Sequence, residues 1–220
     1  MKVLIIQHEK STPPGSTIEW CEKNKFEFQI HMAPEIKNWP SMDDFELLVV
    51  CGGSQNVDQE EIYPWLKTEK KFIAEAFRKN KKIVGLCLGG QLLAEVLGGA
   101  VQKHSSWVVG WFPVKMDDGK VVTAFQYHGY TFSLPPDAKL IASNENCLHQ
   151  GFAMGGHAIG FQFHPETTMA WALECANDPE LPTTGLSQSR DEIRNGVKNQ
   201  PALQEWYFSR LDSLILNSSK

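Results

Sequence analysis

Short apolar runs alternate with helical patterns along the first half of the sequence, and this alternation limits the fold more than any other feature. The apolar runs predict buried strands, and stretches with apolar residues three and four positions apart predict helices. Strands that alternate with helices build a parallel sheet with helices on both faces. We therefore expect a doubly wound, three-layer α/β/α fold. The expected strands are Val3–Ile6, Phe26–His31, Leu47–Cys51 and Ile83–Leu86, and the expected helices are Thr17–Lys23, Thr68–Asn80 and Gln91–Leu97.

The pattern changes from Trp107 onward, where strand candidates follow one another with turn residues between them. Sequences such as Asp-Asp-Gly at 117–119 and Gly-Gly at 155–156 are typical of hairpin turns. We expect antiparallel strands added to a mostly parallel sheet, and a C-terminal helical tail. Residues 1–166 would form the domain, and residues 167–220 its helical extension. The strand candidates are Trp107–Met116, Val121–Gln126, Lys139–Ser143, Gly151–Met154 and Ala158–Phe163, and the helix candidates are Thr167–Ala176, Ser187–Asn199 and Pro201–Leu216.

The charge balance and the cysteine spacing argue against several classes of protein. The 220 residues include 21 Lys and Arg against 26 Asp and Glu, a net charge of −5, so we expect neither nucleic acid nor a membrane as partner. The five cysteines show no CxxC spacing, and we expect no metal and no cofactor. The N-terminal segment lacks the long apolar stretch of a signal peptide. We therefore expect a cytoplasmic protein with free thiols.

The most informative segment begins at Ile83, where a strand leads directly into Gly-Leu-Cys-Leu-Gly at 85–89 and then into a helix. This pattern indicates a nucleophile elbow, a sharp turn whose small flanking residues let the chain fold back. A helix N-terminus stabilises the thiolate form of Cys87, and the N–H of Leu88 is placed to bind an oxyanion. The alternative is a buried structural cysteine whose glycines serve only helix–strand packing.

A nucleophilic cysteine needs a base, and the segment Phe-Gln-Phe-His-Pro-Glu at 161–166 offers one. Alternation puts the two phenylalanines on one strand face and His164 on the other. Pro165 holds His164 extended, and Glu166 is near enough to orient the imidazole ring. Because ligands bind beyond the carboxyl ends of parallel strands, Cys87 and His164 are expected to meet there. The alternative is a surface turn that caps the following helix.

Together these segments resemble the class I glutamine amidotransferase domain, a family with a Cys–His–Glu triad. GLCLGGQ is similar to its nucleophile motif, FQFHPE to its His–Glu motif, and CGGSQNV to its Gly–Gly oxyanion loop. The resemblance covers about residues 1–166 in the expected order. Segments such as YPWL and GWFPV, with the helical tail, are similar to the stand-alone, GMP-synthetase-like branch of amidotransferases.

The resemblance implies a role for each matching residue. In the family, the cysteine forms a γ-glutamyl thioester with glutamine, the histidine transfers protons, and the glutamate orients the histidine. Tyr127, Tyr130 and Ser54 depart from the family pattern, which often has a small residue, an Asp and a Pro at these places. The implied catalytic residues are Cys87, His164 and Glu166, the implied oxyanion donors are the amides of Gly53 and Leu88, and the implied substrate-binding residues are Gln91, Gln126, Tyr127 and His128.

Three functions remain open at this stage. The first is a glutamine amidotransferase that releases ammonia and glutamate, and the second is a γ-glutamyl peptidase or hydrolase acting on glutathione-like substrates. The third is a non-catalytic binding module with the same fold. No GxxxxGK[ST] phosphate loop occurs in the sequence, so we expect the ammonia either to go to a separate acceptor or synthetase protein or to be released. The other four cysteines and the histidines apart from His128 and His164 are expected to be packing or solvated residues.

Overall fold

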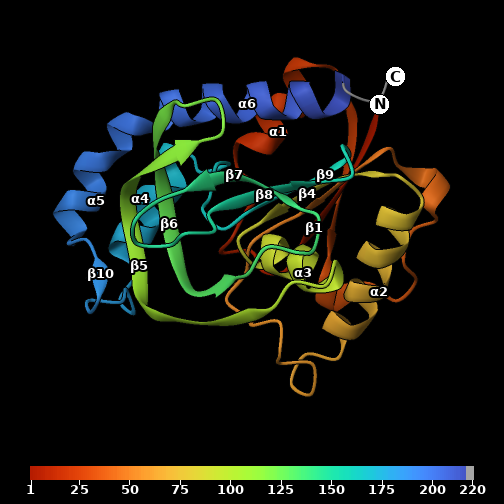
Figure 1. Ribbon diagram of the computed structural model, residues 1–220, viewed down its shortest axis with the longest axis horizontal. Coiled ribbons are helices and arrows are strands. Elements are labelled where there is room, and N and C mark those ends of the chain that lie inside the picture. Colours follow the sequence, from red (N-terminus) through yellow and green to blue (C-terminus); the bar gives the residue numbers. More distant parts are fainter. Residues whose placement is uncertain (217–220) are drawn as a thin grey trace.

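Five parallel strands form one half of a ten-stranded mixed sheet in the computed structural model, which describes residues 1–216 (Figure 1). The four strands inside this half are short and apolar because helices cover both of their faces, whereas the edge strand β2 is partly exposed. The strands lie in the order β9-β4-β3-β1-β2. Their bounds are β1 (Lys2–Gln7), β2 (Glu27–Met32), β3 (Leu47–Val50), β4 (Lys82–Leu86) and β9 (Ala158–Phe161).

Antiparallel strands extend the sheet beyond β9, as predicted. A long hairpin of β5 and β6 turns at residues 117–119, and both strands exceed their predicted ranges. The missed part of β5, residues 101–106, is largely polar and its register slips between Lys103 and Val108, so it lacks the alternation that reveals a strand. A two-residue strand at the edge of the same sheet pairs parallel with β5 and lies outside the predicted strands. These strands are β5 (Val101–Met116), β6 (Val121–Phe132), β7 (Lys139–Ser143), β8 (Gly151–Met154) and β10 (Leu186–Ser187).

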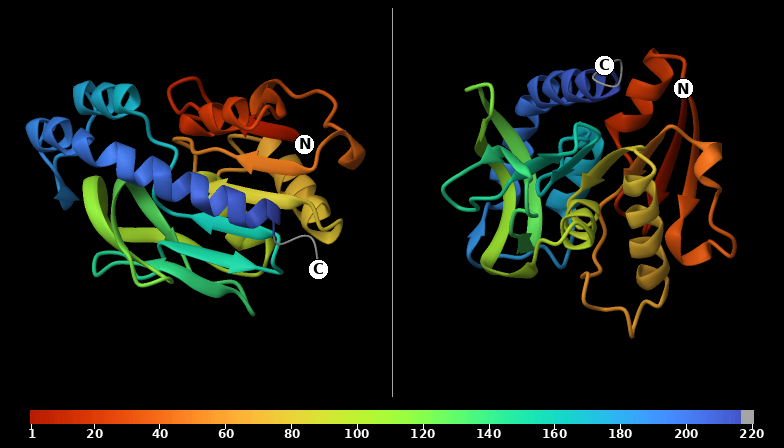
Figure 2. Two further views of the ribbon diagram at one scale, coloured as in Figure 1. Left: turned by 90° about the horizontal axis from the view of Figure 1, so that it is seen from above. Right: turned by 45° about the vertical axis from the view of Figure 1, so that its right-hand side comes forward.

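Helices form the two outer layers. α1 and α6 cover one face of the parallel half, and α2 and α3 cover the other (Figures 1 and 2). This arrangement confirms the predicted three-layer fold and its C-terminal helices. The α-helices are α1 (Ser16–Lys23), α2 (Trp65–Arg78), α3 (Leu88–Val96), α4 (Met169–Asn177), α5 (Arg190–Gly196) and α6 (Gln200–Leu216), and the 3-10 turns are η1 (Ala33–Glu35), η2 (Met42–Asp44) and η3 (Val197–Asn199).

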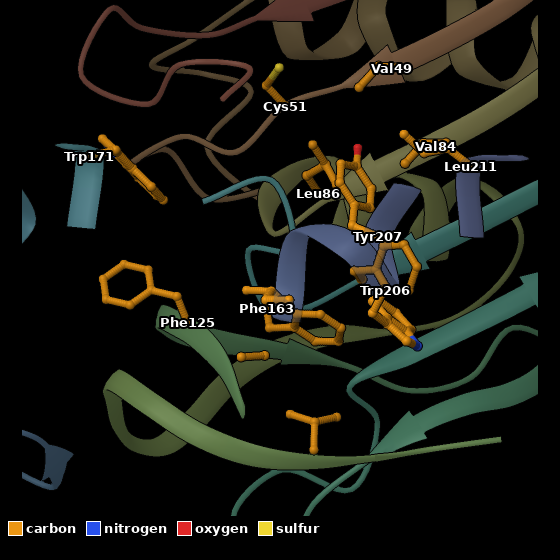
Figure 3. Close-up of a cluster of buried hydrophobic side chains, with 14 of the residues drawn as sticks. Val49, Cys51, Val84, Leu86, Phe125, Phe163, Trp171, Trp206, Tyr207 and Leu211 are labelled. Atoms are coloured by element: carbon orange, nitrogen blue, oxygen red, sulfur yellow. The ribbon is translucent and has the colours of Figure 1, made fainter. Parts of the chain in front are cut away.

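Helix α6 shares its hydrophobic core with the strands it covers. Trp206 packs against Phe163, with ring centroids 5.8 Å apart (Figure 3). Tyr207 is fully buried, and its hydroxyl lies 3.0 Å from the Thr17 hydroxyl of α1. This core is continuous from the N-terminal strands to α6, so it marks no boundary near residue 166. The division at residue 166 stays a prediction.

Candidate active site

Cys87 occupies the tight turn between β4 and α3. Its backbone is left-handed, with φ of 49° and ψ of −105°, a conformation that costs free energy in any residue other than glycine. The Cys87 N–H donates to the carbonyl of Phe161 on the neighbouring strand (2.8 Å). Side-chain accessibility is low, with 6% of the residue exposed. The predicted elbow is therefore present, and its strain is held by the strands on either side.

The glycines around Cys87 allow α3 to approach the sheet closely. A Cβ at Gly89 would overlap the carbonyl of Val50, and one at Gly90 would overlap the carbonyl of Phe161. The Gly89 N–H also donates to the Cys51 carbonyl (3.1 Å). The helix N-terminus can thus lie directly behind Cys87 only because these positions have no side chains.

His164 lies just beyond β9, held by backbone and side-chain hydrogen bonds. Its N–H donates to the carbonyl of Phe125 (2.9 Å) in an isolated antiparallel bridge. Nδ1 of the ring donates to Oε1 of the fully buried Glu166 (2.8 Å), and the ring packs edge-on against Trp171 at 4.8 Å. The strand itself ends at Phe161 rather than at Phe163 as expected, because the chain leaves the β4 edge to pair with β6.

The structure brings Cys87 and His164 together at Gly52. A Cβ at Gly52 would lie 2.8 Å from Cε1 of His164 and 3.6 Å from Cβ of Cys87. Since Nδ1 is bonded to Glu166, Nε2 is the nitrogen left to face Cys87. Burial opposes the charged form of His164, but Glu166 and Cys87 outweigh it and raise the pKa of His164 to about 10. The imidazolium form of His164 is therefore favoured.

Two backbone N–H groups near Cys87 are free to bind a ligand. Within residues 1–216, no hydrogen bond uses the N–H of Gly53 or of Leu88. Leu88 is the first residue of α3, so its N–H belongs to the unpaired group at a helix start. Gly53 follows the carboxyl end of β3, next to Gly52. The assignment of these two amides as oxyanion donors stays a prediction.

A group of buried amide side chains continues from Cys87 toward the predicted substrate side. Sγ of Cys87 lies 3.8 Å from Nε2 of Gln162 and 3.8 Å from the carbonyl oxygen of Tyr127. Gln91 donates from Nε2 to Oε1 of Gln162 (3.3 Å), so both glutamines belong to the same group. Gln162 is not among the site residues predicted from the sequence, although it shares a strand face with His164.

The other predicted substrate residues lie on β6. Gln126 and His128 are buried, and Nε2 of His128 lies 3.0 Å from the Gln126 side-chain amide. The amide N–H of Gln126 has no partner among the described residues, so the amide turned by 180° donates to the neutral His128 ring. Nδ1 of His128 donates to the carbonyl of Tyr130 (2.9 Å). The Tyr127 hydroxyl instead donates to Asp178 (3.0 Å), just beyond α4, so only the backbone of Tyr127 faces Cys87.

His128 predicts an acid-sensitive component of stability. Burial, together with His104 and His164, lowers the pKa of His128 to about 3. Between pH 6.5 and about pH 3, the His128 side chain binds a proton in the unfolded chain but not in the folded one. The free energy of unfolding therefore falls as the pH falls through this range. This term removes about 3 kcal/mol from the free energy of unfolding at pH 4.5 relative to pH 7.

Urea unfolding of the wild type and of His128→Gln at both pH values measures this term. We expect the variant to lose less stability on acidification, because it lacks the titrating group. Equal losses in the two proteins would show that His128 is not held neutral.

The remaining cysteines are buried free thiols without the surroundings of Cys87. Burial raises the pKa of Cys21 to about 11, that of Cys175 to about 12 and that of Cys51 well above its ordinary value. They stay protonated and unreactive at neutral pH, as expected for packing residues. Across residues 1–216, His, Cys, Asp and Glu form no group that could hold a metal ion. In the same range, no helix is both long and apolar enough to cross a membrane.

The chain is similar to known glutamine amidotransferases. The family model described as glutamine amidotransferase class-I matches residues 19–172. A glutamine amidotransferase-like protein of Salmonella typhimurium, YfeJ, is 27% identical over the whole of both chains. A subunit of the glutamine-hydrolyzing GMP synthase of Sulfolobus acidocaldarius is 30% identical over 59% of this chain and 72% of its own length.

Solved structures show the same fold over nearly the whole chain. A glutamine amidotransferase from Thermotoga maritima is 28% identical, with a TM-score of 0.87 over 98% of each chain. A glutamine amidotransferase from Methylobacillus flagellatus is 26% identical, with a TM-score of 0.92 over 98% of this chain and 94% of that one. Both alignments include the C-terminal helices.

Proposed function

Since the chain belongs to the class-I glutamine amidotransferase family, we propose that it hydrolyses the side-chain amide of glutamine through a γ-glutamyl thioester on Cys87. The observation that carries this proposal is the convergence at Gly52 of a strained cysteine and a histidine already bonded to a buried glutamate. Reactive cysteines in this setting carry out acyl transfer.

The first half of the reaction forms the thioester. The Cys87 thiolate attacks the amide carbon, and the N–H groups of Gly53 and Leu88 stabilise the oxygen as it becomes negative. When the tetrahedral intermediate collapses, the C–N bond breaks and the His164 imidazolium donates its proton to the leaving nitrogen. Ammonia leaves, and His164 is then neutral.

The second half hydrolyses the thioester. Neutral His164 takes a proton from water, which attacks the thioester carbon, and the same two N–H groups hold the oxyanion. The C–S bond then breaks, so that glutamate leaves and the thiolate–imidazolium pair returns. Glu166 keeps Nδ1 protonated throughout, so that Nε2 is the nitrogen that exchanges protons.

The amide-rich side of the site is proposed to bind the substrate. Gln91 would contact the bound glutamine, and the backbone at Gln126 and Tyr127 would receive its α-amino and carboxylate groups. His128 would line this part of the site as a neutral ring. The Tyr127 carbonyl supports this arrangement because it lies against Sγ of Cys87.

The ammonia is proposed to pass to a separate acceptor protein. The Sulfolobus relative is named as one subunit of a GMP synthase, which supports a division of this kind between two chains. A γ-glutamyl peptidase is the second candidate. The exposed Trp107 ring lies edge-on to Tyr127, with centroids 6.3 Å apart, and Trp107 would offer an aromatic surface to a leaving group larger than ammonia.

The test is to incubate the purified chain with glutamine, γ-glutamyl dipeptides or glutathione, and to measure glutamate and ammonia. An electrophilic glutamine analogue, a chloroketone, should add once to Cys87, as seen by intact mass and peptide mapping. Preference for glutamine supports the amidotransferase, and strong preference for the peptides supports the peptidase. If the chain neither hydrolyses these compounds nor reacts with the chloroketone, the non-catalytic binding module is the remaining candidate.

A further inference from the structure

A buried charge pair lies at the carboxyl end of β1, where the reaction steps above do not use it. Nε2 of His8 lies 3.0 Å from Oε1 and 3.1 Å from Oε2 of Glu69, which comes from α2. Both side chains are fully buried, and the Trp65 ring stacks on His8 at 5.3 Å. Burying two opposite charges costs several kcal/mol of desolvation for each ion, so the pair needs a reason beyond stability.

The second nitrogen of His8 bonds to the loop that carries a predicted oxyanion donor. Nδ1 lies 2.9 Å from the carbonyl oxygen of Gly52. Both neighbours of the ring, this carbonyl and the Glu69 carboxylate, can only accept hydrogen bonds. Both ring nitrogens therefore carry a proton, and the pKa of His8 is raised because Glu69 and the Gly52 carbonyl outweigh burial.

A bond to the Gly52 carbonyl sets the direction of the Gly53 N–H. The two groups belong to one planar trans peptide, so they point to opposite sides of it. Holding the oxygen on the His8 side leaves the N–H directed away from His8. A Cβ at Gly53 would lie 3.0 Å from Cβ of His8 and 3.1 Å from Cδ2 of Leu88, so the peptide lies between His8 and the second donor residue.

Glu9 holds the next peptide of the same loop. Its Oε1 accepts from the Ser54 N–H (3.1 Å), and its Oε2 accepts from the Ser54 hydroxyl (2.6 Å). Hydrogen bonds with Ser54, Thr12 and Gln55 outweigh burial and lower the pKa of Glu9, so it is ionised at neutral pH. Consecutive residues at the end of β1 thus fix both ends of the Gly53 residue.

We propose that His8, oriented by Glu69, is a positioning residue that fixes the Gly52–Gly53 peptide so that the Gly53 N–H faces the oxyanion. The charged ring also polarises the peptide it bonds to, which strengthens the N–H as a donor. This inference rests on the proposed function, because the oxyanion forms only if Cys87 attacks an amide or a γ-glutamyl carbonyl.

The test compares His8→Leu and Glu69→Gln with the wild type. Loss of one oxyanion donor costs about 10²–10³ in kcat, and we expect about 10²-fold for His8→Leu, with KM within about threefold. Glu69→Gln keeps an acceptor for Nε2 without the charge, so we expect a smaller loss, about tenfold. His157→Asn is the matched control, because His157 also stacks on an aromatic ring and bonds to carbonyl oxygens. It lies beside Ile83, at the end of β4 opposite to Cys87.

Alkylation of Cys87 by iodoacetamide separates positioning from simple structural support. This displacement develops no oxyanion, so its rate should stay near that of the wild type in both variants. A kcat within about threefold of the wild type in Glu69→Gln and His8→Leu, or alkylation that falls in step with kcat, would overturn the proposal. If His8→Leu does not fold, the nearly isosteric Glu69→Gln decides alone. An inactive wild type would instead refute the proposed function, and the role of His8 with it.

Discussion

Cys87→Ala is expected to abolish the release of glutamate from glutamine or γ-glutamyl compounds. Loss of a nucleophile from a triad lowers kcat by about 10⁴–10⁶-fold, and only binding and the oxyanion donors remain. The fold should tolerate the change. Alanine removes only Sγ, and the left-handed backbone at position 87 is held by the neighbouring strands.

Cys175→Ala is the matched control for this change. Cys175 is a buried free thiol on α4 whose raised pKa keeps it protonated. The control should retain wild-type kcat and still react once with the chloroketone, whereas Cys87→Ala should do neither. Glutamate release by Cys87→Ala at a rate near that of the wild type would refute the thioester mechanism.

The parallel half of the fold and the elbow could be predicted because their signals are local. Apolar runs mark strands buried on both faces, and Gly-x-Cys-x-Gly marks a turn that only small residues permit. The hydrogen bond of His164 to Glu166 was also predictable, since they are only two positions apart. In each case the sequence neighbours are also the structural partners.

Other parts of the site depend on contacts between distant residues. His8 and Glu69 are 61 positions apart, and nothing in the local pattern of either residue indicates its partner. The sequence alone therefore predicts only a solvated or satisfied histidine at position 8. The two-residue strand β10 was missed for the same reason, because its pairing with β5 comes from tertiary structure.

The departures from the family pattern at Tyr127 and Tyr130 have a simple structural reading. The Tyr127 side chain turns toward Asp178, where burial and this bond raise its pKa well above the ordinary value. Tyr130 presents its carbonyl to His128. These residues thus face the site through backbone groups, which any residue type can supply, so the substitutions are compatible with the position of Cys87.

Glu166→Gln is expected to lower kcat by about 10³–10⁴-fold while changing KM little, as a neutral amide does in other triads. The introduced amide can turn its N–H toward Nδ1 of His164, which moves the ring proton to Nε2 and leaves no base facing Cys87. The buried carboxylate also raises the pKa of His164, so its loss should lower that pKa toward the ordinary range. NMR titration of the His164 ring, with Glu174→Gln on α4 as control, measures this shift.

Activity and titration together define what Glu166 does. A carboxylate that only filled space could be replaced by the nearly isosteric amide with little effect on either measurement. A carboxylate that orients and charges His164 links the two, so kcat and the His164 pKa should fall together in Glu166→Gln and stay unchanged in Glu174→Gln. A large loss of kcat without a change in the pKa of His164 would show that Glu166 only orients the ring. Cys87 would then be the group that raises the pKa of His164.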